Sequence, residues 1–294
     1  MSSENKPKLA LAIYNGARSI ITRFSPELTS KITYEVSWKR KLDLKDPKDF
    51  NQKIMWLKLK LYGKNPVVTQ CVDKYGVRAY VEEHGCGETL NELIGVWNTV
   101  EDIPWESLPN QFALKLTHSC AANIICKDKS KLDIDWAKKQ LKKWYKEDYY
   151  LTCAEMQYKN VPKRIICEKY IDSFASAPTD YKFYCYYGKP EMVLVVADRG
   201  EHTRKHFYDM NWNFISSKGD AGEIIEKPES LNEMIECCKK LASQFPFVRM
   251  DFYEVNGRAM FGEMTFTPAG GIGKSYSPEV YKKLGDLLVL PQVD

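Results

Sequence analysis

Four polar side chains occupy a segment whose pattern otherwise predicts a half-buried β-hairpin. Residues 247–253 and 258–266 carry apolar residues at strand spacing, and the Asn256-Gly257 pair between them is a strong hairpin signal. The first strand contains Arg249 and Asp251, and the second contains Glu263 and Thr265. A carboxylate buried in a sheet is costly unless a cation or hydrogen-bond donors accompany it. These residue types therefore indicate a site rather than a simple core hairpin.

The register of the hairpin decides whether these side chains share a face. A two-residue turn at Asn256-Gly257 would place Asp251 and Glu263 on opposite faces, because side chains alternate along a strand. One additional residue, in a three-residue loop or in a bulge, would place Asp251 opposite Glu263 and bring Arg249 and Thr265 to the same face. We therefore predict such a loop or bulge, with Gly257 at positive φ.

Two carboxylates, a hydroxyl and a guanidinium on one face suit a magnesium ion that carries a phosphate. Magnesium takes one or two protein carboxylates and completes its shell with phosphate oxygens and water. We predict Asp251, Glu263 and Thr265 as metal-binding residues. Without metal, repulsion between the carboxylates should raise the pKa of at least one of them, so neutralising either should spare the fold. An amphipathic hairpin with a solvated polar face explains the same residues equally well.

A second candidate site surrounds Lys115. Residues 112–117 predict a strand with one interior lysine, and the small residues of the following segment, His118 to Asn123, would let backbone N–H groups approach an anion. Lys115 would add a point charge for a phosphate, and Ser119 lies in the same loop. The alternative is an edge-strand lysine before a turn.

Local signals predict several supporting elements. Ser25-Pro26 indicates a helix boundary, and Asp49 and Asp133 are candidate N-caps of the helices that follow them. We also expect helices over residues 50–62 and 231–245 and a short helix that ends near residue 83. Strands are expected over residues 164–171, 180–187 and 191–197, and a polar loop over 199–212.

Composition limits the class of protein. At 294 residues and 44% hydrophobic, the chain can bury a proper core. No signal peptide or apolar stretch of membrane-spanning length is recognisable, and nine cysteines without metal-ligand spacing are expected to be reduced thiols of a cytoplasmic protein. Residues 1–65 hold 14 Lys and Arg against 6 Asp and Glu, whereas the remainder holds 29 against 33. Such a basic, aromatic arm suits an anionic glycan or the inner face of a membrane, although a basic solvated face would suffice.

Taken in order, these segments resemble the nucleotide site of ATP-grasp enzymes, and most closely the teichuronopeptide-biosynthesis (TupA-like) branch found among surface-polysaccharide proteins. The resemblance implies an α+β ATP-grasp fold in which two α+β subdomains hold ATP between them. We expect a helical basic extension over residues 1–65 and an ATP-grasp domain over 66–294, with lobes 66–180 and 181–294. The matching segments are FNQKIMWLKL from Phe50, VDKYGVRAYV, LPNQFALK, EKYI, DYKFYCYYGKP, FYDMNWN and FVRMDFYEVNGRAMFGEMTFTP.

The resemblance also assigns roles to individual residues. Lys74 and Lys115 resemble the lysines that contact ATP phosphates, and Asp251 and Glu263 resemble the magnesium carboxylates. Arg249 resembles the arginine that stabilises the transferring phosphoryl group, with Arg204 or Lys205 as further cations and His118 as a base for the amine. The adenine and ribose side of the site would comprise Glu168, Lys169, Tyr170, Ile171 and Asp180, and we add Lys182 from the same strand as Asp180. Thr265 and the SCAA loop depart from the family pattern, which has asparagine and more glycine there.

The implied activity is ATP-dependent carboxylate–amine ligation through an acyl phosphate. The branch suggests a uronic-acid carboxylate of a glycan and an amino acid or amine as substrates, with ATP and magnesium as cofactors and no nucleic acid partner. Two alternatives remain: a kinase that phosphorylates a sugar hydroxyl, and a catalytically silent glycan-binding protein.

Overall fold

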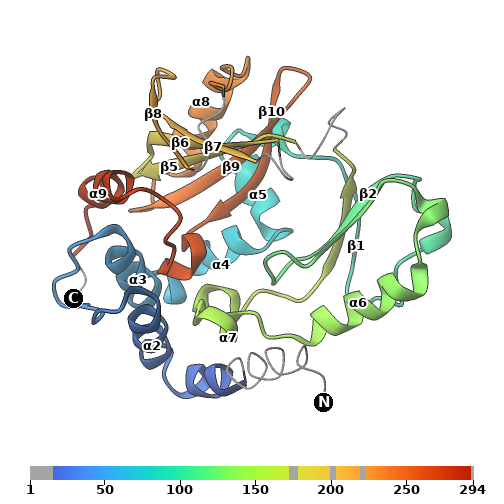
Figure 1. The fold of residues 1–294 in the computed structure, drawn as a ribbon. Coiled ribbons are helices and arrows are strands. Elements are labelled where there is room, and N and C mark those ends of the chain that lie inside the picture. Colours follow the sequence, from blue (N-terminus) through green and yellow to red (C-terminus); the bar gives the residue numbers. More distant parts are fainter. Residues whose placement is uncertain (1–15, 172–177, 199–202, 219–222, 293–294) are drawn as a thin grey trace, which may run out of the picture.

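The computed structural model describes residues 16–171, 178–198, 203–218 and 223–292. Two antiparallel sheets lie beside each other, with helices around them (Figure 1). The first part of the predicted basic arm, residues 1–15, lies outside the described residues. The longer helices are α2 (Pro26–Trp38), α3 (Phe50–Lys60), α4 (Pro66–Val72), α5 (Gly76–Glu83), α6 (Ile134–Lys146), α7 (Tyr150–Cys153), α8 (Leu231–Leu241) and α9 (Pro278–Leu287).

Sheet A forms the smaller lobe. Its strand order is β1-β4-β2-β3, and every neighbouring pair is antiparallel. Helix α6 packs on this sheet, and Ala137 and Leu141 of the helix share a buried core with Phe112, Leu114 and Ile165 of the strands. The strands are β1 (Leu93–Trp97), β2 (Phe112–Leu116), β3 (Asn123–Cys126) and β4 (Ile165–Lys169).

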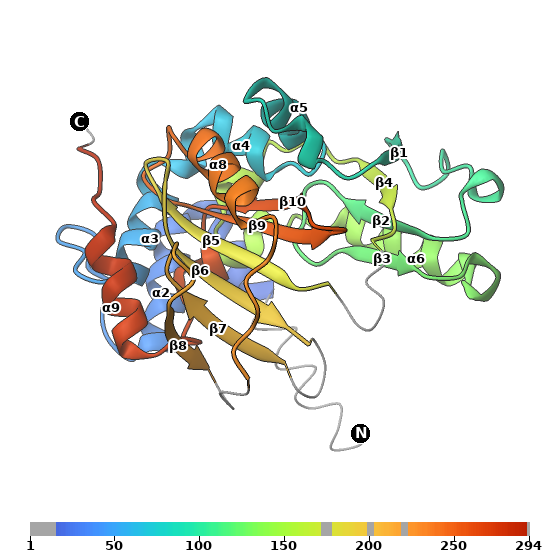
Figure 2. The same ribbon diagram turned by 90° about the horizontal axis from the view of Figure 1, so that it is seen from above.

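Sheet B forms the larger lobe, in the order β10-β9-β5-β6-β7-β8, again antiparallel throughout. Seen from above, sheets A and B occupy opposite sides of the molecule (Figure 2). The strands are β5 (Asp180–Tyr186), β6 (Lys189–Ala197), β7 (Arg204–Tyr208), β8 (Phe214–Lys218), β9 (Val248–Val255) and β10 (Arg258–Thr265). The predicted α+β fold with two lobes is therefore confirmed.

The predicted helix starts are confirmed by their capping bonds. Ser25 accepts the backbone N–H of Leu28 at 3.1 Å, and Asp49 accepts that of Gln52 at 3.1 Å. Asp133 accepts the N–H of Trp136 at 2.9 Å. Each bond satisfies one of the donors that a helix leaves open at its first turn. The ends were less accurate: α3 ends at Lys60 and α8 at Leu241, a few residues before the predicted ends.

The predicted loop over residues 199–212 is wrong for residues 204–208. Residues 204–208 form β7, which pairs with β6 and with β8. His206, Phe207 and Tyr208 are buried. Polar residues surround this strand in the sequence, and its strand structure depends on pairing with β6 and β8, which lie elsewhere along the chain. Residues 199–202 lie outside the described part of the chain.

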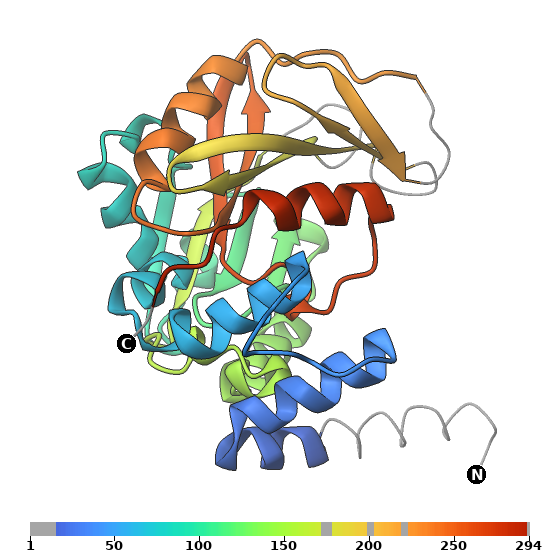
Figure 3. The ribbon, with the colours of Figure 1, turned by 90° about the vertical axis from the view of Figure 1, so that its left-hand side faces the viewer.

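The two faces of sheet B have different coverings. Helix α8 packs on the face that carries Phe183, Val193 and Met250. The other face is partly covered by an aromatic layer, in which Phe50 of α3 meets Tyr184 of β5 at 6.4 Å between ring centroids. In Figure 3, α9 (red) lies between sheet B and the blue helices α2 and α3. The uncovered part of this face carries the charged residues.

The N-terminal helices belong to the core of the larger lobe. Phe50, Ile54, Leu57 and Tyr62 are buried in the same hydrophobic cluster as the strands of sheet B. The hydroxyl of Tyr62 donates to the carbonyl of Phe247 at 2.6 Å. The boundary at residue 65 stays a prediction, but residues 50–62 contribute directly to the core.

The β9–β10 hairpin combines a two-residue turn with a bulge. Asn256 and Gly257 form the turn at φ 52° and 72°, and Arg258 pairs with Val255. The register then shifts at Gly262, so that Glu263 faces Asp251 and Thr265 faces Arg249. The predicted shared face is thus confirmed, as is the positive φ of Gly257. The additional residue is a bulge within β10 rather than a longer loop.

Gly262 lies so close to the backbone of β9 that a larger residue would not fit at this position. A Cβ at this position would lie 2.9 Å from the carbonyl oxygen of Asp251 and 3.2 Å from the ring of Tyr253. We predict that Gly262→Ala lowers the free energy of unfolding by about 1–3 kcal/mol, as overpacking does, measured by denaturant unfolding. Gly16→Ala is the matched control, because no atom lies within 4 Å of the added Cβ. Equal stability of the two variants would contradict the packing argument.

Candidate active site

The charged face of sheet B is organised around the Asp251 carboxylate. Arg249 binds it through two nitrogens, Nε to Oδ1 at 2.6 Å and a terminal nitrogen to Oδ2 at 2.7 Å. Lys182 reaches the same carboxylate from β5 at 2.5 Å and also contacts Asp180 at 3.2 Å. Asp251 is only 2% exposed, so this bidentate arginine and the lysine are the partners that its burial requires.

Glu263 and Thr265 complete this face on β10. The Thr265 hydroxyl donates to Glu263 Oε1 at 2.7 Å, and Arg249 contacts Glu263 at 3.3 Å and Thr265 at 3.1 Å. The side chain of Glu263 is 47% exposed, in contrast to that of Asp251. All three residues predicted to bind the metal therefore lie together, next to Arg249.

The expected rise of a carboxylate pKa is wrong for Asp251. Burial alone would raise the pKa of Asp251, but the charges of Arg249 and Lys182 outweigh it and lower the pKa below its ordinary value. Their ion pairs dominate because both cations touch the carboxylate directly. Lys182 was predicted on the nucleotide side of the site, and its contact with Asp251 depends on the pairing of β5 with β9.

In the first lobe, Glu168 joins two cations. Lys115 of β2 contacts Glu168 of β4 at 2.6 Å, and Arg78 of α5 contacts it at 3.3 Å. Arg78 also donates to the carbonyl of Asn91 at 2.9 Å. Glu168 is 8% exposed. Arg78 was not predicted; it stands in the VDKYGVRAYV segment, where only the fold shows that its side chain reaches β4.

Lys74 lies where the two lobes meet. Its ammonium donates to the carbonyl of Ser119 in the loop after β2. Burial lowers the pKa of Lys74, and the negative charge of Glu263 in the second lobe is the strongest opposing influence. Lys115 and Glu168 act on it from the first lobe. Charged residues of both candidate sites therefore act on Lys74, and its role in phosphate binding stays a prediction.

The loop after β2 adopts a glycine-like conformation without glycine. Ala121 has φ 60°, in the left-handed region that most side chains avoid. Ser119 is buried, whereas Cys120 is exposed. The SCAA segment thus makes a tight turn at the end of β2 that a glycine-rich loop would make with less strain.

The predicted adenine-binding segment begins inside a strand. The N–H of Lys169 donates to Glu92 O at 3.0 Å, and its carbonyl accepts from Asn91 Nδ2 at 2.8 Å. Both backbone groups of Lys169 are therefore engaged by the segment before β1. Adenine binding by this segment stays a prediction. Within the segment, we now assign it to Tyr170 and Ile171.

Two of the predicted catalytic residues lie elsewhere. Arg204 pairs with Asp198 at 2.5 Å, and its register in β7 places it on the face of sheet B opposite to Asp251. Lys205 shares the face of Asp251 by the same register. His118 is 3% exposed and packs edge-on against Tyr145 at 5.9 Å. This packing favours a core role for His118 over that of a base.

A buried network that the sequence did not reveal involves the segment after β10. Lys58, one of the basic residues of the N-terminal arm, is 1% exposed and donates to Cys153 O at 2.9 Å and Gly270 O at 3.1 Å. Burial lowers the pKa of Lys58 to about 8. Burial also raises the pKa of Glu155, which bonds the hydroxyl of Thr267. The network fixes the segment that follows β10, and no local signal distinguishes Lys58 from its solvated neighbours.

The residues present fit magnesium that arrives with a nucleotide. Within the described ranges, no group of three or more His, Cys, Asp or Glu side chains could enclose a metal by itself. Asp251 and Glu263 nevertheless offer two carboxylates opposite each other, with Lys74 nearby for the phosphates. Magnesium binds through such a pair and takes its other ligands from phosphate and water. Asp251 and Glu263 would hold the ion, with Thr265 beside them.

Lysines in one α+β lobe and paired carboxylates in the other are the features that the resemblance to ATP-grasp enzymes implied, and the charge of Glu263 acts on Lys74. A family model described as TupA-like ATPgrasp matches residues 52–289. The match covers most of the chain, and the protein therefore belongs to the TupA-like ATP-grasp family.

Comparisons with other proteins add weaker similarities. No curated protein matches the chain. A D-alanine–D-alanine ligase from Bacillus anthracis, solved in complex with ATP, is 17% identical at a TM-score of 0.49, over 75% of this chain and 65% of that one. The D-cycloserine synthetase DcsG is 14% identical at a TM-score of 0.45, over 76% of this chain and 71% of that one. The chain thus spans less than two thirds of the first ligase, and the family assignment rests on the family model.

The two carboxylates should respond differently to neutralisation. Asp251→Asn leaves Arg249 and Lys182 buried beside a neutral group, so we expect it to lower the free energy of unfolding by about 3 kcal/mol. Glu263→Gln changes a half-exposed side chain and should alter stability by about 0.5 kcal/mol or less. Both variants should weaken Mg²⁺-dependent ATP binding about tenfold or more, measured by calorimetry. Unchanged MgATP binding by Glu263→Gln would contradict the metal site.

His118 should make the fold sensitive to acid. Burial lowers its pKa from 6.5 to about 4, so between these values the unfolded chain binds a proton that the folded chain does not. Stability should therefore fall as the pH drops from 6.5 towards 4. His118→Asn should remove this component of the pH dependence, measured by denaturant unfolding at several pH values. His84→Asn, which also deletes one histidine, is the control and should retain it.

Proposed function

We propose that this protein is an ATP-dependent carboxylate–amine ligase that activates a uronic-acid carboxylate and joins it to an amino acid or another amine. The family assignment supports ATP as the co-substrate. The observation that supports the proposal is that Lys74 bonds the loop after β2 and is also influenced by the charge of Glu263 on β10, so the proposed phosphate-binding and metal-binding residues act on each other across the two lobes.

The chemistry requires positioning and charge compensation from the protein. A carboxylate oxygen of the acceptor attacks the γ-phosphorus of ATP, the bond to the β,γ-bridging oxygen breaks, and ADP leaves. The nitrogen of the amine then attacks the acyl carbon, loses a proton, and inorganic phosphate departs with the former acceptor oxygen. Magnesium, when bound, would neutralise phosphate charge at Asp251 and Glu263.

The side chains of this chain have corresponding roles. Lys74 and Lys115 would bind phosphate oxygens, and Lys115 would exchange its contact with Glu168 for one with the nucleotide. Arg249 would direct its guanidinium at the transferring group from the face that it shares with Asp251. Such fixed charges in a site shielded from water are the main contribution that phosphoryl transfer needs.

Hydroxylamine can replace the unknown amine in a test of this proposal. The protein, MgATP and hydroxylamine should convert a panel of uronic acids, free or in oligosaccharides, into hydroxamates with release of ADP and phosphate, detected by mass spectrometry. Glu263→Gln is the control and should reduce product about a hundredfold or more. Phosphate retained on the acceptor without hydroxamate would identify a kinase instead. MgATP binding with no product from any acceptor would favour the silent glycan-binding alternative.

A further inference from the structure

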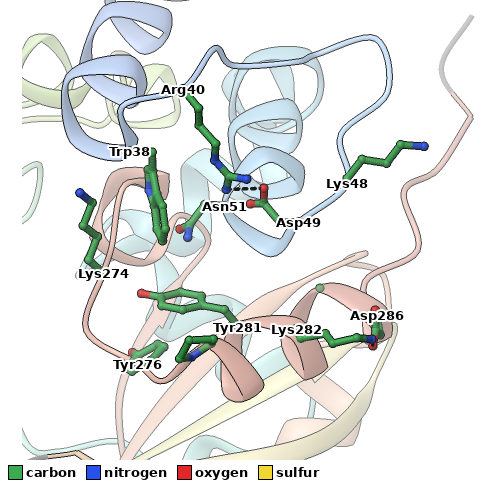
Figure 4. Close-up of a pocket in the computed structure, with 12 residues that line it drawn as sticks. Trp38, Arg40, Lys48, Asp49, Asn51, Lys274, Tyr276, Tyr281, Lys282 and Asp286 are labelled. Carbon is green, nitrogen blue, oxygen red and sulfur yellow. Dashed lines mark hydrogen bonds and ion pairs between the residues drawn. The ribbon is translucent and has the colours of Figure 1, made fainter.

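A pocket separate from the cluster around Asp251 opens between the N-terminal helices and α9. Its volume is about 490 Å³, and two segments line it: the end of α2 with the loop into α3, and residues 274–286 (Figure 4). The two segments are distant in sequence, so the pocket exists only in the folded chain. Nothing in the chemistry proposed above uses it.

The walls of the pocket are aromatic. Trp38 meets Tyr281 edge-on at 5.8 Å, and Tyr276 lies 5.2 Å from Tyr281. All three rings line the cavity. Rings held in this way present flat apolar surface with polar groups at the edge, which suits the C–H face of a sugar ring. An extended acidic peptide has no such flat face to offer.

The charge of the lining is positive. Four cations, Arg40, Lys48, Lys274 and Lys282, stand against the two carboxylates of Asp49 and Asp286. Arg40 pairs with Asp49 at 2.7 Å, and Lys282 pairs with Asp286 at 2.5 Å. Lys48 pairs with Asp46, which lies outside the lining, so Lys274 is the cation that remains in excess over these ion pairs. An anionic ligand is favoured over a neutral one of the same shape.

Lys274 is the best-placed cation for such a ligand. Its ammonium lies 5.3 Å from the centre of the Trp38 ring and donates to the carbonyl of Ser37. Within the described part of the chain, its ammonium has no carboxylate partner. A ligand carboxylate could thus bind Lys274 without separating an existing ion pair, while the sugar ring contacts Trp38.

The pocket is joined to the candidate active site through one aromatic layer. Tyr276 and Tyr184 share a hydrogen bond of 2.6 Å between their hydroxyls. Tyr184 of β5 pairs in turn with Arg249 of β9. Tyr184 therefore connects Tyr276 at the pocket with the strand that carries Arg249, and the pocket adjoins the face of sheet B that carries Asp251.

We propose that this pocket is an anchoring subsite for an anionic saccharide chain, which holds one acidic sugar unit while another unit of the same chain reaches Arg249 and Asp251. The reaction of the unit that reaches Arg249 and Asp251 rests on the proposed function, whereas the binding of the acidic sugar in the pocket is independent of it. The sequence predicted glycan binding for the whole basic arm. This proposal limits it to Trp38, Arg40 and Lys48 of the arm, together with residues near the C-terminus.

The test compares binding of oligogalacturonate of about six units with binding of galacturonic acid, by calorimetry at low salt. The double variant Lys48→Gln/Lys274→Gln should bind the oligomer about five- to tenfold more weakly than the unmodified protein, and added salt should reduce the difference. Trp38→Phe, which preserves an aromatic core, should bind more weakly at every salt concentration. MgATP binding should be unchanged in both variants.

Three controls make the outcome decisive. Lys131→Gln removes an exposed lysine of the smaller lobe, whose side chain is 83% exposed, and should bind the oligomer normally. A neutral hexasaccharide and an oligoglutamate should bind at least tenfold more weakly than the oligogalacturonate. Equal binding of either control ligand, equal binding by the double variant, or no binding to the unmodified protein would each overturn the proposal. Oligomer binding without hydroxamate formation would refute the proposed ligase activity and leave the subsite intact.

Discussion

The ion cluster around Asp251 constrains the rest of the larger lobe. A carboxylate that is almost completely buried can persist only with cations in contact, and Arg249 and Lys182 reach it from β9 itself and from β5. Arg249 and Asp251 share a face because they lie two residues apart in β9, whereas the Lys182 contact requires the observed register between β5 and β9. A slip by one residue would place Lys182 and Asp251 on opposite faces of the sheet. The bulge at Gly262 then brings β10 into the same arrangement. The site and the sheet are therefore specified by the same pairing, and neither could shift without the other.

Two of the cations proposed to bind phosphate already have carboxylate partners. Lys115 pairs with Glu168 and Arg249 pairs with Asp251, so a phosphate group would have to compete with these carboxylates. Lys74 differs, because its ammonium contacts a backbone carbonyl of the neighbouring loop. A phosphate would therefore find Lys74 available at lower cost than Lys115 or Arg249. This order follows from the ion pairs and is independent of the identity of the acceptor.

A feature could be predicted from the sequence when the residues that determine it lie close to one another along the chain. The turn at Asn256-Gly257 and the cap at Asp49 are local, because the residues that form the bonds lie within a few positions of one another. The location of the bulge was not predictable, because a turn loop and a bulge bring Asp251 and Glu263 to one face equally well. Lys58 and β7 were missed for a different reason: burial of the first and pairing of the second are decided by segments far along the chain. The lowered pKa of Asp251 likewise depends on a lysine of another strand.

The burial of Phe50 and Ile54 among strands of sheet B has a consequence for the order in which a ribosome-bound chain can fold. These residues are synthesised early, but their core partners include Phe247, Val248 and Leu284. The larger lobe therefore cannot close until residues 247–284 have emerged. Sheet A, contained within residues 93–169, has all of its strands much sooner. Domains generally fold as units during synthesis, so we expect the smaller lobe to form first. Until β9, β10 and α9 are synthesised, the apolar faces of the N-terminal helices stay exposed.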